Sequence, residues 1–235
     1  LLKWVTKHQI DGVPLHVVME ATGVYHQRFA YYLQKQHINV TIVLPNKISN
    51  YLRTLEGKTI TDRSCADAIA RFGLERKLDN WVPPSRIYRT LQQLTRERDQ
   101  IVCERVVVKN QLHAEKAEAY PNERTLLRLD ERLQLLNKQE REIKRDIKES
   151  LKIDPQIRDH VDRICTIPGV GELTAVTVLG ETNGFELIKS KKQLTSYAGL
   201  DVKEKQSGTS VKGKPRISKK GNRHLRKAMH LPALT

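Results

Sequence analysis

Two acidic residues stand at positions from which an acid can bind a metal ion. Glu20 ends a short apolar run, residues 16–20, that is typical of a buried strand, and ligands of open α/β sheets bind at the carboxyl ends of strands. Asp62 follows Thr61, a predicted helix cap, and so begins a helix. Mg²⁺ prefers carboxylate oxygens and substrate phosphates, so the pair predicts a Mg²⁺ site for phosphate chemistry. The alternative is that Asp62 stabilises the helix dipole and Glu20 is solvated.

A serine late in the chain is the candidate nucleophile. Ser207 is followed by Gly208 and lies among Lys and Arg residues. Cations in such a segment stabilise the negative charge that develops when a hydroxyl attacks a phosphodiester. The alternative is a solvated serine in a flexible basic loop, because no His–Asp relay is evident nearby.

The turn over residues 167–171, Ile-Pro-Gly-Val-Gly, resembles a helix–hairpin–helix turn. Gly169 and Gly171 would let backbone N–H groups approach a phosphate, and the N-terminus of the following helix favours the anion. The alternative is an ordinary turn between two helices, with Pro and Gly as punctuation.

The charge of the chain predicts a nucleic-acid partner. Forty-two Lys and Arg oppose 27 Asp and Glu, which gives a net charge of +15. Residues 203–227 hold ten of these cations and one acid, interrupted by glycines and a proline, so they are not an amphipathic membrane helix. No apolar run is long enough to cross a membrane. The three cysteines form no CxxC pair, which argues against zinc or disulfide sites and fits the cytoplasm.

The elements that must position these residues fall into three predicted domains. In residues 1–84, an apolar strand over 16–20 and a β-branched strand over 39–44 alternate with helices that end near residues 36, 55 and 78, which indicates an α/β unit. In residues 85–154, apolar residues near heptad spacing predict a long antiparallel helical arm, with Glu140 in a vacant core position. Residues 155–235 predict a small α-rich basic domain, whose last helix spans residues 221–234.

Four blocks of the sequence together resemble transposases of the insertion-sequence-110 family. Each occurs in the family's order and at its distances over nearly the whole chain. The blocks are His16-Val-Val-Met-Glu20-Ala-Thr-Gly-Val-Tyr25-His26; Thr61-Asp62-Arg63 followed by Ala66, Ile69 and Ala70; Ile167-Pro-Gly-Val-Gly171 with Thr174 and Ala175; and Ser207-Gly208 through Ile217-Ser-Lys-Lys-Gly-Asn-Arg-His-Leu-Arg226.

The resemblance implies a DNA transposase or recombinase of the bacterial cytoplasm, associated with the nucleoid. Its first domain would be RuvC-like, of the ribonuclease H fold, with an Asp-Glu-Asp-Asp set that binds Mg²⁺. Its last domain would supply a serine nucleophile that cuts and rejoins double-stranded DNA. Family members are directed by a bridge RNA that the element encodes, and they work as dimers that pair into tetramers.

Carried over by position, Glu20 matches the family Glu, Asp62 matches the third acid, and Ser207 matches the nucleophile, with Ser210 as the nearby alternative. The first Asp is expected upstream of Leu1, so the first strands would be missing, and the C-terminal domain is expected to be truncated. The predicted nucleic-acid-binding residues are Gly169, Gly171, Lys212, Lys214, Arg216, Lys219, Lys220, Arg223 and Arg226.

The last family acid falls on Cys65, a poor ligand for a hard metal. Asp67 is the alternative acid, but it lies two residues further on, about 200° around a helix. Two other functions therefore stay open: a RuvC-like junction resolvase or nuclease that needs only the metal, and a non-catalytic nucleic-acid-binding remnant.

Overall fold

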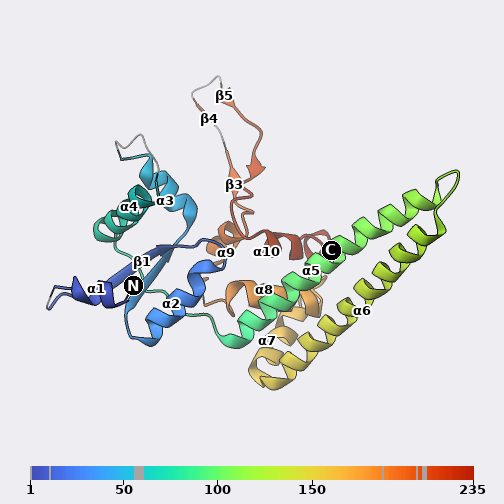
Figure 1. The fold of residues 1–235 in the computed structure, drawn as a ribbon, viewed down its shortest axis with the longest axis horizontal. Helices are drawn as coiled ribbons and strands as arrows, with labels where there is room; N and C mark the ends of the chain where they lie inside the picture. The colour runs from blue at the N-terminus through green and yellow to red at the C-terminus, as the bar shows by residue number, and fades with distance from the viewer. Residues whose placement is uncertain (1, 11, 56–60, 187, 205, 208–210) are drawn as a thin grey trace. The chain divides into compact units, whose positions relative to one another are not determined.

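The computed structural model describes residues 2–10, 12–55, 61–186, 188–204, 206–207 and 211–235 (Figure 1). By its contacts the chain divides into two compact units, which are described separately below. Unit 1 is Leu1–Pro83 and unit 2 is Pro84–Thr235. None of the helices in this part of the chain is both long and apolar enough to cross a membrane.

Unit 1 is a small α/β unit. Its elements are α1 (Leu2–Lys7), β1 (His16–Glu20), α2 (Tyr25–Lys35), β2 (Asn39–Val43), α3 (Pro45–Leu52) and α4 (Asp62–Glu75). The two strands are parallel, with His16 opposite Asn39 and Glu20 opposite Val43, and α2 connects them. Both predicted strands and the helices after them are confirmed, whereas the short helix α1 was not predicted.

Apolar contacts hold the helices of unit 1 to its sheet. Ala30 and Leu33 of α2 form a buried cluster with Val40 of β2. Helix α4 crosses β1 so closely that a Cβ added at Gly73 would lie 2.7 Å from Cγ2 of Val18. The absence of a side chain at this glycine therefore sets how near the helix that begins at Asp62 approaches the strand that ends at Glu20.

Unit 2 contains the predicted helical arm, formed by α5 (Arg86–Lys116) and α6 (Glu123–Ile153), which run antiparallel and pack along each other (Figure 1). Asn122 caps α6, because its side-chain oxygen accepts a hydrogen bond from the Thr125 N–H. The seam between the helices is apolar except at Glu140. Its buried members include Ile101, Val108, Leu112, Leu129, Leu136, Ile143 and Ile147.

Glu140 fills the predicted vacant position of this seam and is buried there. Arg98 Nη2 and Lys144 Nζ each lie 3.0 Å from its carboxylate, and Arg105 donates a further hydrogen bond. Burial alone would raise the pKa of Glu140, but the hydrogen bonds and charges of Lys144 and Arg105 outweigh it and lower the pKa to about 2.

Shorter helices complete the body of unit 2: α7 (Pro155–Cys165), α8 (Glu172–Thr182), α9 (Lys191–Tyr197), α10 (Arg223–Ala228) and the 3₁₀ turn Pro232–Leu234. Helix α8 is the most buried of them, and it packs against α5. A Cβ added at Gly180 would lie 2.9 Å from the backbone nitrogen of Gln92, so the two helices approach at backbone distance.

The segment between α9 and α10 is a β-ribbon, which was not predicted. Strand β3 (Val202–Lys203) pairs antiparallel with β6 (Arg216–Ile217), and β4 (Gln206–Ser207) pairs with β5 (Val211–Lys212). The ribbon extends away from the body of unit 2 (Figure 1). Its strands are two residues long, so no alternating pattern could develop in the sequence.

The helix predicted over residues 221–234 is shorter than expected, which corrects that prediction. It spans only Arg223–Ala228 and is followed by a turn. Pro232 cannot donate the amide hydrogen bond that would continue the helix, and in a continued helix its ring would clash with the carbonyl of Ala228, four residues earlier.

Candidate functional site

Glu20 lies at the carboxyl end of β1, as the sequence predicted, and it is half-buried there. Its neighbour Ala21 still donates a backbone hydrogen bond to the Val43 carbonyl, at 2.9 Å. The Thr22 N–H then donates to the Glu20 carbonyl at 2.9 Å and turns the chain away from the sheet. Strand pairing therefore fixes the backbone that carries the Glu20 carboxylate.

Asp62 is the first residue of α4, and it is exposed. A reciprocal capping box sets this helix start. The Ser64 N–H donates to Thr61 Oγ1 at 3.2 Å, and the Thr61 N–H donates to Ser64 Oγ at 2.8 Å. The prediction that Thr61 caps the helix and Asp62 begins it is confirmed.

The two carboxylates suit Mg²⁺ in their chemistry, because both offer hard oxygen ligands. In the described ranges of the chain, however, no three His, Cys, Asp or Glu side chains lie together as a metal-binding group. Helix α4 crosses Val18 at Gly73, eleven residues or about 16 Å of helix after Asp62. This crossing holds the helix that begins at Asp62 and the strand that ends at Glu20 together in unit 1.

Cys65 and Asp67 lie on different faces of α4. Asp67 is exposed, and one of its oxygens is 3.0 Å from Nε of Arg71. Cys65 is half-buried on the side that bears the buried Ala68. Asp67 is therefore already paired with Arg71 on the exposed side of the helix.

The ribbon carries Ser207, whose backbone in β4 pairs with that of Val211. Ser210 lies outside the described residues. At the stem of the ribbon, Ser218 Oγ donates to an oxygen of Asp201 at 2.7 Å, and the Ser218 N–H donates to the Asp201 carbonyl at 2.8 Å. These two hydrogen bonds join the two chain segments of the stem, just before β3 and just after β6.

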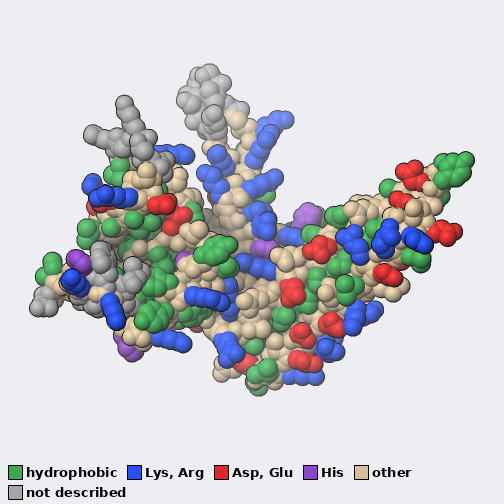
Figure 2. Space-filling view, in the orientation of Figure 1, with side chains coloured by type: hydrophobic (Ala, Val, Ile, Leu, Met, Phe, Trp, Pro, Cys, Tyr) green, Lys and Arg blue, Asp and Glu red, His purple; other side chains and the backbone are tan. Residues whose placement is uncertain are grey.

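Lys and Arg side chains gather along the ribbon and beside its stem (Figure 2). Those with described, exposed side chains are Lys203, Lys214, Arg216, Lys219, Lys220, Arg223 and Lys227. Arg226 differs from them, because it is half-buried and its Nη1 donates to the Ala198 carbonyl at 2.7 Å. Besides the phosphate contact predicted for it, Arg226 therefore holds α10 to the end of α9.

The two glycines of the turn between α7 and α8 have different surroundings. Gly169 has a φ of +78°, and a Cβ there would lie 2.4 Å from Oγ1 of Thr235. Gly171 is the N-cap of α8, and a Cβ there would meet nothing within 4 Å. The N-terminus of α8 is therefore open at Gly171, whereas the chain around Thr235 packs onto Gly169.

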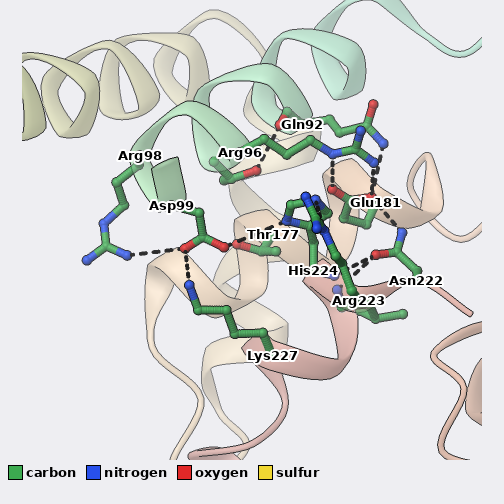
Figure 3. Close-up of polar contacts among 12 residues, drawn as sticks. Gln92, Arg96, Arg98, Asp99, Thr177, Glu181, Asn222, Arg223, His224 and Lys227 are labelled. Carbon is green, nitrogen blue, oxygen red and sulfur yellow. Dashed lines mark hydrogen bonds and ion pairs between the residues drawn. The ribbon is translucent and has the colours of Figure 1, made fainter. Parts of the chain in front are cut away.

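Sequence reasoning missed a fully buried acid, Glu181, at the end of α8 (Figure 3). Arg96 of α5 contacts both of its oxygens, with Nε 2.7 Å from Oε1 and Nη2 2.8 Å from Oε2. Asn222 donates from Nδ2 to Oε2 at 2.6 Å, and Gln92 donates to the same oxygen at 3.1 Å. We call Glu181, Arg96 and Asn222 the Glu181 clamp.

These hydrogen bonds keep Glu181 ionised. Burial would raise the pKa of its carboxyl, but the hydrogen bonds from Arg96 and Asn222 outweigh burial, so the pKa lies below its ordinary value. The sequence did contain a signal: an acid at the end of the apolar stretch Ala175–Gly180 has no place in a buried helix unless cations meet it.

A second contact joins α10 to α5. Asp99 of α5 lies 3.1 Å from Nζ of Lys227 and 3.7 Å from Nδ1 of His224 (Figure 3). Arg98 approaches the same carboxylate at 3.9 Å. The basic helix α10 is therefore held by polar contacts to α8 at Glu181 and to α5 at Asp99.

Two transposase families match this chain, one over its first half and one over its C-terminal third. A DEDD-type transposase family of IS110 elements, described as transposase, matches residues 1–121. A second family, described as transposase IS116/IS110/IS902 family, matches residues 161–235. The chain belongs to the IS110 family of transposases. Membership implies DNA binding and DNA transposition, and the DEDD domain suggests the use of a divalent metal.

Similar proteins span most of this transposase sequence. The pilin gene-inverting protein of Moraxella lacunata is 29% identical over 237 residues, covering 100% of this chain and 71% of its own length. The transposase for insertion sequence element IS1328 of Yersinia enterocolitica is 25% identical, covering 92% of this chain and 69% of its own length.

Proposed function

We propose that this chain cuts and rejoins DNA strands during the transposition of an insertion element. The observation that carries the proposal is that transposase families of the same type match the acid-bearing start and the basic, serine-bearing end of one chain. In this proposal unit 1 is part of a RuvC-like domain of the ribonuclease H fold, which would explain its parallel β1–α2–β2 unit.

Glu20 and Asp62 are the proposed metal ligands, and Mg²⁺ is the proposed ion. When bound, Mg²⁺ would stabilise the charge that develops at a scissile phosphate. The chain's own contribution is to hold the ligands in place: pairing with β2 fixes the backbone of Glu20, and the capping box fixes the first turn of α4 at Asp62. Asp67 is the alternative acid, and it would first have to leave Arg71.

Ser207 is the proposed nucleophile, with Ser210 as the alternative. Its hydroxyl oxygen attacks the phosphorus, the bond from phosphorus to one strand end breaks, and that strand leaves as a hydroxyl with the proton the serine gives up. The phosphoserine ester keeps the bond energy, so a second strand's hydroxyl rejoins the DNA by the reverse step. Neighbouring cations of the basic segment, residues 203–227, stabilise the phosphate charge in both steps.

The basic segment and the turn between α7 and α8 form the proposed nucleic-acid interface. Their cations and backbone N–H groups suit phosphates, which dominate the affinity of proteins for DNA. The residues are Gly169, Gly171, Lys212, Lys214, Arg216, Lys219, Lys220, Arg223 and Arg226. The family resemblance alone adds two further parts of the proposal: a bridge RNA encoded by the element, and dimers that pair into tetramers.

Strand exchange by the full-length protein tests the catalytic assignment. We expect Ser207→Ala and Glu20→Gln each to abolish exchange between an element end and its target. Ser210→Ala is the matched control, because it is the same substitution three residues away, and it should keep activity. Exchange by the Ser207→Ala variant would remove Ser207 from the mechanism, and loss in Ser210→Ala alone would transfer the role to Ser210.

Cys65 favours a second candidate function, a non-catalytic nucleic-acid-binding protein, since a thiol is a poor ligand for Mg²⁺. The Cys65→Asp variant separates the two functions. If Cys65 weakens metal binding in an active transposase, the variant should cleave DNA faster than the wild type in Mg²⁺. If neither protein cleaves DNA while both bind it, the chain is a binder only.

A further inference from the structure

We propose that Glu181 and Asn222 are positioning residues: the Glu181 clamp orients the basic segment, residues 203–227, so that its cations meet a phosphate backbone as one surface. The inference rests on the proposed nucleic-acid interface and adds to it the group that sets its geometry. Neither residue needs to touch DNA for this role.

One carboxylate joins three elements that are far apart in the chain. Glu181 belongs to α8, Arg96 to α5, and Asn222 is the residue that caps α10 (Figure 3). Arg96 meets both carboxylate oxygens in the two-pronged geometry that gives the strongest directional preference. Any rotation of the segment at Asn222 therefore breaks a charge-assisted hydrogen bond inside the protein.

The Asn222 side chain both caps α10 and donates to Glu181. Its Oδ1 accepts hydrogen bonds from the N–H groups of His224, at 2.9 Å, and Leu225, at 3.0 Å, which caps α10. Its Nδ2 donates to Glu181 at 2.6 Å. The cap that starts the basic helix is thus the same group that ties it to the buried carboxylate.

Because Asn222 lies within the basic segment, its hydrogen bond to Glu181 also affects where the neighbouring cations lie. The exposed cations Lys219 and Lys220 precede it, and Arg223 follows it directly. A change of backbone direction at residue 222 would therefore move cations on both sides. Because electrostatic contacts with DNA add over several phosphates, their relative placement decides how many are made at once.

Close backbone packing supports the clamp. A Cβ at Gly221 would lie 2.4 Å from the carbonyl oxygen of Tyr197 and 2.5 Å from the nitrogen of Gly199. The Asn222 N–H donates to the same Tyr197 carbonyl at 2.7 Å, and the Tyr197 hydroxyl donates to the Glu181 carbonyl at 3.1 Å.

Packing alone would hold α10 without a buried charge, since Leu225 already lies in an apolar cluster with Val178 and Ala198. Ionised groups are costly to bury, and apolar replacements often stabilise a protein equally well. The buried carboxylate adds a defined orientation of α10 relative to α5 and α8, because Arg96 and Asn222 must both donate to its oxygens.

Exchanging the two clamp groups tests the inference. Asn222→Asp keeps the helix cap but sets two carboxylates against each other, and Glu181→Gln sets two amides together and leaves Arg96 without its partner. In the double variant Glu181→Gln/Asn222→Asp, the new amide donates to the new carboxylate, so the three clamp positions again hold one amide, one carboxylate and one guanidinium.

The readout is the affinity of the full chain for a DNA duplex and its dependence on salt. We expect each single variant to bind about tenfold more weakly and the salt slope to fall by about 1 for each phosphate that the protein no longer neutralises. The double variant should recover to within about threefold of wild type. A merely destabilised but folded protein would keep the wild-type slope, so the slope separates positioning from stability.

Asn122→Asp is the matched control. It is the same substitution at another helix N-cap, that of α6, and it adds the same charge away from the basic segment. Circular dichroism and thermal unfolding establish that each variant is folded. If Asn222→Asp does not fold, Asn222→Ser carries the same test, because serine keeps the cap and is too short to reach Glu181.

Two outcomes would overturn the inference alone: folded clamp variants that bind with wild-type affinity and slope, or a double variant no better than its weaker parent. Failure of the wild-type chain to bind any DNA duplex is a different result. It would contradict the proposed nucleic-acid interface itself, and the positioning role would fall with it.

Discussion

At the scale of single residues, two acids of unit 2 are buried among the described residues, and each is paired with at least one cation. Glu140 lies in the arm with Arg98, Arg105 and Lys144, and Glu181 lies at the end of α8 with Arg96. Removing one partner of such a group leaves the rest buried and uncompensated, which costs more than the intact group contributes. Substitutions at these acids are therefore more informative than substitutions at surface charges.

The pKa of Glu140 makes a prediction about acid unfolding. The folded-state pKa is about 2, below the ordinary 4.5, so the carboxylate contributes stability above about pH 4.5 and loses it as the pH falls toward about 2. At about pH 7, Glu140→Gln should lower the free energy of unfolding by about 1–3 kcal/mol. Urea denaturation from about pH 7 to about pH 3 should show this difference shrinking with acid.

Glu142→Gln is the control for that measurement. Glu142 lies two residues further along the same helix, and its oxygen is 3.9 Å from Nζ of Lys138, with both side chains largely solvated. Its substitution should change stability by less than about 0.5 kcal/mol at any pH. Equal effects of the two variants would contradict the account of Glu140.

Residues with local signals were predictable, and residues with distant partners were not. Glu20 follows from a strand pattern five residues long, and Asp62 follows from a capping residue directly before it. Glu181 is separated in sequence from Asn222 by 41 positions and from Arg96 by 85, so the residues next to it in the sequence do not indicate these contacts. Its only trace in the sequence is an acid at the end of an apolar helix.

At the scale of elements, the arm was the most predictable part of the chain. Its apolar residues recur at helical spacing for eight turns or more. The same kind of contact between the two helices therefore repeats along the arm. The ribbon gave no such pattern, because each of its strands is two residues long. Its pairing depends on contacts at the stem, such as Ser218 with Asp201, which the sequence does not display.

Two neighbouring leucines test the seam of the arm. Leu136 is 8% exposed between α5 and α6, and Leu135 is 54% exposed. Leu136→Ala should lower the free energy of unfolding by about 2–4 kcal/mol, since it removes buried apolar volume and leaves a cavity. Leu135→Ala should cost less than about 1 kcal/mol, because little apolar surface is removed from the interior.

Chemical denaturation of the two variants gives the comparison directly. A similar loss of stability in both would mean that α5 and α6 do not pack through the seam described here.

At the scale of the whole molecule, charge is unevenly distributed: residues 203–227 hold ten cations and one acid within a chain of net charge +15. That asymmetry was readable from the sequence, and it agrees with membership of a DNA-transposing family. Three domains were predicted, but α8 packs so closely on α5 that the arm and the basic region form one compact unit. The three-domain division stays a prediction.

The salt dependence of DNA binding tests where the interface lies. Replacing Lys214 and Arg216 by Gln together should reduce the slope of log Kd against log salt concentration by about 2. Replacing Lys138 and Arg145 of α6 removes the same charge from the arm and should leave the slope nearly unchanged. Equal reductions would show that net charge, and not the ribbon, governs binding.

The central claim is that a serine of the ribbon becomes covalently joined to DNA, and covalent capture tests it most directly. The full-length protein is incubated with Mg²⁺ and a DNA substrate that traps the cleaved strand, and the adduct is mapped by mass spectrometry of its peptides. The account predicts a phosphoester on Ser207 that is absent from the Ser207→Ala variant. DNA cleavage that proceeds with no adduct on any serine of the ribbon would contradict it.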